Sequence, residues 1–504
     1  MTLNDNSSSF TYVIKVGFKV SLATYAVYVA YKCFIKPYFS PLKQDMPGPA
    51  FRPVIGNLYD LYSSRPMEIE IKWTEKYGKF VHFHNVFNED IVMISCPKAI
   101  NHVLIVNHKN YEKQKAFQVN QRLIGDGVMA STGRDHAKYR GMIAPAAFNA
   151  DSITVMTTVF NMYVTSLCQL WRHNLSQSND GIICVQKYFK QLTLDIMGRC
   201  TFGYEFEALS GCNIDAKNIS AVFNRAVTGQ LFGLVQFIPY FQYLPLACNR
   251  EIEAGLSVVR KAIDSTIALK RNSRQRSTSD VDLLDILMDI KDETGKPAFT
   301  DKQLRDNILT FMMAGRETAT AALSWTLYLL AKHPKIQDKA RTEIQNVLQQ
   351  DRDLANSDLD QLKYIEFIIM ETLRLYPPVD VLRRVAKKDD VIQNYKIPAG
   401  TLIYIALAVC QRCDDAFPNG NEFNPERFKR EDVRDHGVLS FSIGSRTCMG
   451  KRFAMTEMKI TLAKLLFNFK FSLPSANQCI EPRRCGMFIL PNPLIQLKVE
   501  PILI

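Results

Sequence analysis

The chain of 504 residues is 47% hydrophobic and 22% charged, which is typical of a folded protein with a large core and excludes a globally disordered chain. No internal repeat or long low-complexity linker divides the sequence, so we expect one large domain after an N-terminal segment. The formal net charge of +12 is spread along the chain, which argues against a nucleic-acid-binding arm and fits a basic surface for an acidic protein or anionic lipid headgroups.

The start of the chain predicts attachment to a membrane. Residues 20–31 form an apolar run that is shorter than the ~20 residues a spanning helix needs. Extending the run back to Phe10 reaches that length only by including Lys15 and Lys19, which lie one helical turn apart and could both reach the headgroups. The segment would either span the membrane or lie on it; the alternative is an ordinary amphipathic helix of a soluble domain.

The charges around this run predict its orientation. Lys32, Lys36 and Lys43 follow the run, whereas the tail before Phe10 contains Asp5 and no base, so the positive-inside rule places the C-terminal bulk in the cytosol. No small-residue cleavage site follows the run, which disfavours a signal peptide. The first arginine is Arg52, which disfavours an arginine-rich mitochondrial transit peptide.

The chain is expected to have three regions: an anchor over residues 1–36, a stiff proline-rich hinge over 37–50 and the main domain over 51–504. Within the main domain, the alternation at 81–84 and the apolar stretch at 91–94 predict a small strand pair. Most later segments have the helical period. The predicted fold class is therefore mainly α with small β-sheets.

Two stretches and the cysteines carry weaker signals. Residues 230–245 are rich in aromatic side chains between prolines, and residues 273–282 are polar and predict a flexible connection. The twelve cysteines show no disulfide or zinc spacing, and the C-x-x-C pair at Cys410 and Cys413 is weak support for a metal or redox site without a second pair. Reduced thiols are the expectation for a cytosolic domain.

The longest helix is predicted to begin at Thr300, where Thr300 and Gln303 form a capping box, and to end near His333 before a proline. At 1.5 Å per residue it would be roughly 45 Å long. Between residues 308 and 331 its only charges are Arg316 and Glu317. The capped start and the charged pair at its middle favour a buried helix over a transmembrane one.

The segment 441–450 contains Cys448 between Gly444 and Gly450, with Arg446 two residues before the cysteine. A thiolate persists where backbone N–H groups or positive charge lower its pKa. Both glycines allow backbone angles that other residues avoid, and such angles are expected to let the loop wrap tightly around the sulfur. A lone cysteine is more often a buried thiol in a turn. The whole pattern, which begins with the aromatic Phe441, favours a metal-ligating thiolate instead.

This pattern resembles the heme-binding loop of the cytochrome P-450 family, and the resemblance covers nearly the whole chain after Pro47. It implies a single large heme-thiolate fold after a membrane-anchor helix, with heme b (iron protoporphyrin IX) as cofactor. Cys448 would be the axial ligand of the heme iron, and Phe441, Gly444 and Gly450 would shape the loop around the cofactor. Thiolate ligation favours O–O cleavage.

The sequence Ala314-Gly315-Arg316-Glu317-Thr318 resembles the oxygen-activating kink of the same family. The resemblance implies that Gly315 weakens the helix locally and that Thr318 turns its hydroxyl away from the carbonyl four residues earlier. Thr318 would position protons, and Glu317 would supply them, when dioxygen is reduced. Some family members link heme to a glutamate at the place of Ala314, so no such ester is expected here.

Further motifs resemble groups that support the heme. Glu371 and Arg374 match the family's Glu-x-x-Arg motif, and with Arg427 they would form a buried network. The heme propionates would be bound by four residues: Arg140, Arg384, Arg446 and His136, the last of which stands where the family usually has tryptophan. Buried carboxylates need such cations.

The resemblance implies a monooxygenase that inserts one oxygen atom of O2 into an apolar substrate. Electrons would come from NADPH through a separate flavoprotein reductase, or also from a cytochrome b5-type donor, that docks near Lys451 and Arg452. Motifs at Ala314–Thr318 and Cys448 are most similar to members acting on long-chain fatty acids, while sterols and xenobiotics stay open. The expected location is the endoplasmic reticulum membrane, facing the cytosol.

Other interpretations remain. A family member that rearranges peroxides without O2 is disfavoured by Glu317 and Thr318. A non-catalytic heme-binding sensor or carrier would need Cys448 but not Thr318, and an inert membrane-tethered scaffold would need neither.

Overall fold

The computed structural model describes the chain outside residues 1–4, 115–123, 179, 212–242, 273–280, 415, 432, 434–437 and 503–504. Most of the aromatic stretch at 230–245 and of the polar connection at 273–282 therefore lies outside the described residues. The chain forms two compact units, one of Met1–Tyr111 with Arg383–Ala406 and one of Glu112–Leu382 with Leu407–Ile504.

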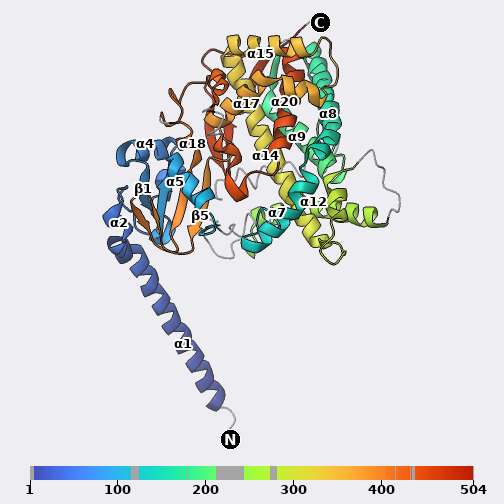
Figure 1. Cartoon of the computed structure of the whole chain (residues 1–504). Helices are drawn as coiled ribbons and strands as arrows, with labels where there is room; N and C mark the ends of the chain where they lie inside the picture. The colour runs from blue at the N-terminus through green and yellow to red at the C-terminus, as the bar shows by residue number, and fades with distance from the viewer. Residues whose placement is uncertain are drawn as a thin grey trace. The chain divides into compact units, whose positions relative to one another are not determined.

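The first unit is built around a sheet with the strand order β1-β2-β8-β5-β3. The strands are β1 (Phe80–His84), β2 (Asp90–Ile94), β8 (Leu402–Ala406), β5 (Val381–Ala386) and β3 (Tyr111–Lys113). Strands β1 and β2 pair antiparallel, which confirms the predicted strand pair, while β8 joins β2 in parallel. Blue and orange strands thus lie side by side although they are far apart in the sequence (Figure 1).

The remaining elements of this unit are short apart from the first helix. They are α1 (Asp5–Ala30), η1 (Tyr31–Ile35), η2 (Lys36–Phe39), α2 (Leu42–Asp45), α3 (Leu58–Ser63), α4 (Glu68–Tyr77), η3 (Val86–Asn88), α5 (Pro97–Asn101), η4 (His102–Val106) and the hairpin of β6 (Asp390–Ile392) and β7 (Tyr395–Ile397). The predicted N-terminal helix is therefore present as α1.

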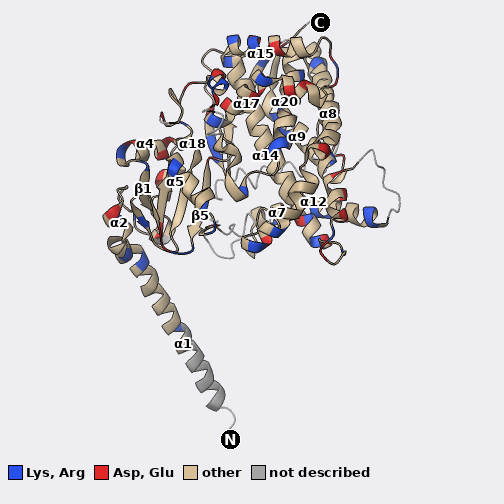
Figure 2. Cartoon of the chain, viewed as in Figure 1, with Lys and Arg blue, Asp and Glu red and all other residues tan. Residues whose placement is uncertain are grey.

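Most described side chains of α1 are apolar and exposed. Val20, Leu22, Tyr25 and Val27 are all more than half exposed, so the helix presents hydrophobic groups that no described part of the chain covers. Charged side chains are sparse along its described part (Figure 2). By length and composition, the helix that could cross a membrane among the described residues is α8 (Ala150–Gln177), whose side chains Phe160 and Trp171 are fully buried in the core.

The segment after α1 is held against strand β1. His82 N–H donates to the carbonyl of Pro47 at 3.0 Å, and a Cβ atom on Gly48 would lie 1.8 Å from the carbonyl oxygen of His82. Earlier in this segment, the carbonyl of Cys33 accepts a hydrogen bond from the Asn88 side chain at 2.6 Å. The proline-rich segment is therefore packed onto the sheet, and only glycine fits at position 48.

The second unit is mainly helical. Its helices are α7 (Gly133–Ala147), α8, α9 (Val185–Phe202), α12 (Ala247–Asn272), α13 (Leu283–Asp289), α14 (Asp301–Lys332), α15 (Pro334–Val347), α16 (Asn356–Gln361), α17 (Lys363–Leu375), α18 (Leu407–Cys410) and α20 (Lys451–Asn468), with the short turns η6 (Pro425–Lys429), η7 (Leu439–Phe441) and η8 (Gly444–Arg446). Its small sheets are β4 (Ile182–Cys184) with β12 (Gln496–Pro501) and β9 (Phe469–Ser472), and β10 (Glu481–Cys485) with β11 (Phe488–Asn492). The predicted fold class is confirmed.

Helix α14 is the centre of this unit. Both bonds of the predicted capping box between Thr300 and Gln303 are present, and the helix ends at Lys332 with His333 as its cap. It contacts α9, α17 and α20 (Figure 1). Its side chains are buried on most sides, so the apolar run that it carries is a core helix, as the capped start predicted.

Gly315 has a packing role in α14. The helix continues without interruption through this position, so the expected local weakening is not observed. A Cβ atom at Gly315 would lie 2.3 Å from Sδ of Met197 on α9. The glycine therefore lets α9 approach closely.

Helix α20 carries a buried acid, Glu457, which is 1% exposed. Its Oε1 atom has no hydrogen-bond partner among the described residues. Burial raises the pKa of Glu457 to about 8. The folded state then binds this proton more tightly than the unfolded state, so stability falls as the pH rises from the ordinary value of 4.5 toward 8.

We expect Glu457→Gln to be more stable than the wild type at about pH 8, by on the order of 3 kcal/mol, because the amide keeps the shape of the protonated acid and never ionises. The difference should shrink as the pH falls toward 5. Thermal unfolding of both proteins across this pH range measures it, with the exposed Glu500→Gln as control. A difference that does not vary with pH would contradict the expectation.

Candidate active site

The loop around Cys448 is fixed by its own backbone. Cys448 N–H donates to the carbonyl of Phe441 at 2.8 Å, and Thr447 N–H donates to that of Gly444 at 3.1 Å. Gly444 has φ +77°, a conformation that favours glycine, as the sequence predicted. Gly450 has φ −81°, so the prediction of an unusual backbone angle there is wrong. Gly450 instead precedes the first turn of α20, where any residue could adopt its angles.

The Cys448 thiol is free and exposed, unlike most cysteines of the described chain. Although solvent reaches the sulfur, the surrounding protein still limits its hydration, and this burial raises the pKa of the thiol. The Gly450 N–H and the charges of Arg140 and Lys451 act in the opposite direction. An accessible sulfur in a positively charged environment is suited to bind a metal ion as thiolate.

Two arginines lie close to the cysteine loop. Arg140, on α7, donates from Nη1 to the carbonyl of Thr447 at 2.7 Å, and Arg446 donates from Nη2 to the carbonyl of Ser131 at 2.8 Å. Burial and the neighbouring charge of Arg140 lower the pKa of Arg446, which Glu112 only partly offsets. Two partly buried cations so close together favour binding of an anionic group.

These residues fit heme, because the donor set combines one accessible thiol with cations that could bind carboxylates. His136 lies one turn before Arg140 on α7 and is 9% exposed. Arg384 belongs to the other unit, where its Nη1 donates to the carbonyl of Arg383 at 2.9 Å. The assignments of His136 and Arg384 to the propionates stay predictions.

The middle of α14 is accessible on one side only. Ala314, Gly315 and Thr318 are partly exposed, whereas Arg316 and Glu317 are fully buried. Thr318 donates its hydroxyl to the carbonyl of Ala314 at 2.6 Å, so the expectation that it turns away from this carbonyl is wrong. In an unbroken helix this carbonyl is the nearest acceptor, and the hydroxyl oxygen still has a lone pair for another donor.

Glu317 does not share the accessible side of α14. Its Oε1 atom accepts from Nη1 of Arg316, and its Oε2 atom has no hydrogen-bond partner among the described residues. The structure therefore brings Thr318 to the accessible side of the helix and keeps the carboxyl group of Glu317 inside the protein.

Glu371, Arg374 and Arg427 lie together in a buried network. Arg374 donates to both carboxylate oxygens of Glu371, at 2.7 and 2.9 Å, and Arg427 Nε donates to Oε1 at 2.9 Å. Arg374 also donates to the carbonyls of Gln411 and Gly420, at 2.7 and 2.6 Å. The buried ion pair on α17 thus fixes the position of the segment that precedes the cysteine loop.

Sequence reasoning missed Arg412, which lies inside the C-x-x-C pair. Its Nη2 donates to the carbonyl of Leu375, and burial lowers its pKa to about 10. A Cβ atom on Gly420 would lie 2.1 Å from the carbonyl oxygen of Arg412. The contacts of Arg412 and Gly420 therefore hold this segment in place. A local sequence pattern does not predict them.

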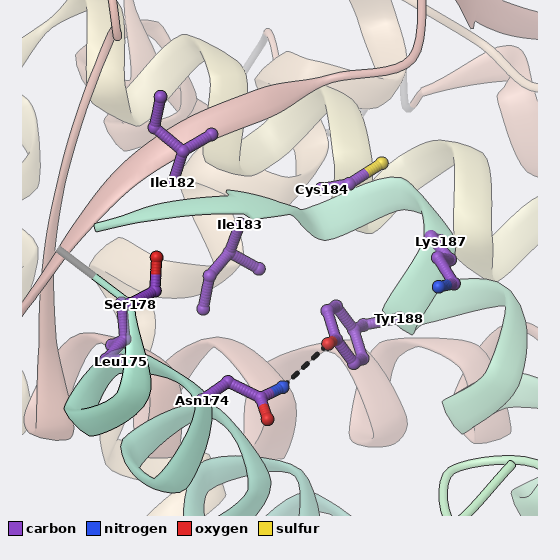
Figure 3. Close-up of a pocket in the computed structure, with 8 residues that line it drawn as sticks. All are labelled: Asn174, Leu175, Ser178, Ile182, Ile183, Cys184, Lys187 and Tyr188. Atoms are coloured by element: carbon purple, nitrogen blue, oxygen red, sulfur yellow. Dashed lines mark hydrogen bonds between the residues drawn. The ribbon is translucent and has the colours of Figure 1, made fainter. Parts of the chain in front are cut away.

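A small pocket of about 170 Å³ lies away from these residues, between the end of α8 and strand β4 (Figure 3). Asn174 donates to the hydroxyl of Tyr188 across it at 2.7 Å. None of the predicted site residues lines it, so it is not the candidate active site. Its lining residues are Asn174, Leu175, Ser178, Ile182, Ile183, Cys184, Lys187 and Tyr188.

Comparison with known proteins identifies the family of this chain. The family model described as Cytochrome P450 matches residues 46–499. Cytochrome P450 monooxygenase 205 of Postia placenta is 28% identical, over 91% of this chain and 92% of that protein. Cytochrome P450 734A1 of Arabidopsis thaliana is 28% identical, over 88% of each. Cytochrome P450 4F5 of Rattus norvegicus is 30% identical, over 75% of this chain and 74% of that protein. The chain therefore belongs to the cytochrome P450 family and is a heme-dependent monooxygenase.

Proposed function

We propose that this monooxygenase hydroxylates a long-chain fatty acid, with electrons passed from NADPH through a separate flavoprotein reductase. The accessible thiol of Cys448 beside the cations of Arg140 and Arg446 is the observation that carries the heme-dependent part of this proposal. The fatty-acid part rests on the resemblance of Ala314–Thr318 and of the segment after Cys448 to members that act on such substrates. Bound heme supplies the dioxygen chemistry.

Residues of the chain would bind the heme and support its site. Cys448 would ligate the iron through its thiolate, and Arg140, Arg446, His136 and Arg384 would hold the propionates. Phe441 is already in contact with the cation of Lys451, 5.8 Å from its ring centroid, which would help to fix the loop. Glu371, Arg374 and Arg427 would support this side of the site without touching the reacting atoms.

Thr318 would position protons on the accessible side of α14. Its hydroxyl donates to the carbonyl of Ala314, so its oxygen can accept a hydrogen bond from a water molecule and hold that water in a fixed place. Glu317 would supply these protons through a path of water molecules to its buried carboxylate. The two roles are therefore separable by experiment.

We expect Thr318→Ala to lower product formation by ~100-fold, because positioned proton transfer contributes factors of this order. Heme content and the spectral response to substrate should be unchanged. Thr326→Val is the matched control, because Thr326 makes the same kind of bond, to the carbonyl of Ala322 at 2.7 Å, at a fully buried place in the same helix. Equal product formation by Thr318→Ala and wild type would contradict the role.

The substrate class can be tested by a spin-state screen of the purified holoenzyme, followed by mass spectrometry of products formed with reductase, NADPH and O2. Hydroxylated long-chain fatty acids are the expected products. Turnover of sterols or xenobiotics alone would replace the substrate assignment. Heme binding without NADPH-dependent O2 consumption for any substrate class would favour a sensor or carrier.

The redox partner would dock on the surface beside the cysteine loop. Lys451 and Arg452 are exposed at the start of α20, directly after the candidate ligand. Their charge suits an acidic flavoprotein, and a cytochrome b5-type donor would use the same charge. Charge reversal at Arg452 should raise the reductase concentration needed for half-maximal rate without changing the maximal rate.

We further propose that residues 1–36 anchor the protein in the endoplasmic reticulum membrane, with residues 37–50 as connection and the catalytic domain from 51 to 504 in the cytosol. The exposed apolar side chains of α1 and the lysines that follow it support this arrangement. Alkaline extraction of microsomes should leave the full-length chain in the membrane pellet, and its release would contradict an anchor.

A further inference from the structure

Strands β1 and β2 bring two histidines and an aspartate together in the first unit. His82 and His84 are two residues apart on β1, so their side chains share one face, and His84 lies directly opposite Asp90 on β2. His82 Nε2 is 2.8 Å and His84 Nε2 is 3.7 Å from the same oxygen, Oδ1 of Asp90. One ligand atom from each residue can be chosen so that all lie within 4.8 Å of one another.

These distances suit a tetrahedral metal ion. Zinc binds imidazole nitrogen and carboxylate oxygen at about 2.0–2.2 Å, which separates neighbouring ligands in a tetrahedron by roughly 3.3 Å. The distances of 2.8 and 3.7 Å lie on either side of this value, so small side-chain rotations would complete the geometry. Two histidines and one carboxylate also leave a fourth position for water.

His84 lacks the contacts expected for a buried imidazole. The residue is 3% exposed, and neither of its ring nitrogens has a hydrogen-bond partner among the described residues. A buried polar group without a partner normally costs free energy. The neighbouring ring of His82, at 4.7 Å between centroids, and the ring of Phe51, at 5.7 Å, do not satisfy these nitrogens. A metal ion between His84 and Asp90 would give Nε2 of His84 a partner.

The charges around the cluster are compatible with a cation. Lys36 lies 3.9 Å from Oδ2 of Asp90, whereas both histidines face Oδ1, so the lysine and a metal ion would use different oxygens. A neutral imidazole is the form of histidine that ligates metals. Asp90 supplies the negative charge.

We propose that His82, His84 and Asp90 form a binding site for a divalent transition-metal ion, separate from heme, with zinc as the representative ion. The metal would bind Nε2 of each histidine and Oδ1 of Asp90. On binding, the His82 ring would carry its proton on Nδ1, so that the lone pair of Nε2 faces the metal. The site would tie β1 to β2 next to the segment that follows α1.

The test measures metal in the heme-loaded, full-length protein. After dialysis against buffered zinc, elemental analysis with heme iron counted separately should find about one zinc per chain in the wild type. X-ray absorption at the zinc edge should show imidazole ligands at about 2.0–2.1 Å. His84→Phe and Asp90→Asn should each weaken zinc binding by at least ~100-fold, because each removes a direct ligand.

The matched control is His102→Gln. His102 Nε2 also donates to a carboxylate, Oδ2 of Asp390 at 2.8 Å, in the same unit, and no second histidine joins this pair among the described residues. Its loss should not change the zinc content. Zinc that binds equally to the wild type and both site variants, or no zinc above the level of His84→Phe, would overturn the proposal.

A stability measurement covers the case in which a variant folds poorly. Zinc should raise the unfolding temperature of the wild type, and a chelator should reverse the rise. His84→Phe keeps an aromatic ring and removes an unsatisfied polar group, so it should fold and be insensitive to zinc. If His84→Phe responds to zinc as the wild type does, the histidines are structural only. Neither readout depends on monooxygenase activity.

Discussion

Replacing Cys448 with serine is expected to reduce monooxygenase activity by at least ~100-fold and to remove the thiolate signature from the spectrum of the reduced, carbon monoxide-bound protein. The serine oxygen is a poor substitute because an alcohol loses its proton to a metal ion far less readily than a thiol does. The backbone of the loop should persist, since Cys448 N–H rather than its side chain donates to Phe441.

Cys479→Ser is the matched control for this variant, because Cys479 is another exposed thiol of the described chain, in a different part of the second unit. It should keep full activity and an unchanged spectrum. If Cys448→Ser retained the wild-type spectrum, the ligand would have to be a different residue. The roles given to Arg140, Arg446 and Thr318 would then lose their basis.

Removing one partner of the buried network should have the largest effect on stability. Glu371→Ala leaves the guanidinium groups of Arg374 and Arg427 without their carboxylate, and Glu371 and Arg374 are both 0% exposed. Breaking such a pair costs about 3–5 kcal/mol, because a buried charge remains uncompensated. We expect little folded, heme-containing protein at growth temperature, measured by heme content per chain and by chemical unfolding.

One variant tests whether the charge of Arg374 is sufficient without its hydrogen-bond geometry, and a second variant, in a surface ion pair, is the control. Arg374→Lys keeps the charge but cannot make the paired bonds to Glu371 or reach the carbonyls of Gln411 and Gly420, so it should also be destabilised. Lys72→Ala removes an exposed pair with Glu68 on α4 and should leave stability unchanged. Equal stability of Glu371→Ala and Lys72→Ala would show that the network contributes no more than a surface ion pair.

Several features of this protein could be predicted from local sequence because the physical cause lies within a few residues. The capping box of α14 needs only Thr300 and Gln303, and the left-handed angle at Gly444 follows from a tight loop before Cys448. The alternation at 81–84 and the apolar stretch at 91–94 were enough to predict the strand pair β1 and β2. The family itself was recognisable because its motifs are short and contiguous.

Other features depended on which segments meet in space. Arg140 contacts the carbonyl of Thr447 across 307 residues, and Gly315 is explained by Met197 on another helix. The hydroxyl of Thr318 bonds within its helix, because α14 continues where a break was expected. Such contacts are set by packing, which local patterns do not encode.

By itself, the sequence determined the family and the mainly helical fold with its long capped helix, and it predicts Cys448 as the heme ligand. Only the tertiary structure decided that Glu317 is buried beside Arg316, that Gly450 needs no special angle, and that His82, His84 and Asp90 converge. The reason is that a short motif fixes the chemistry of its own residues. The neighbours that surround a side chain come from distant segments, and they decide what it can bind.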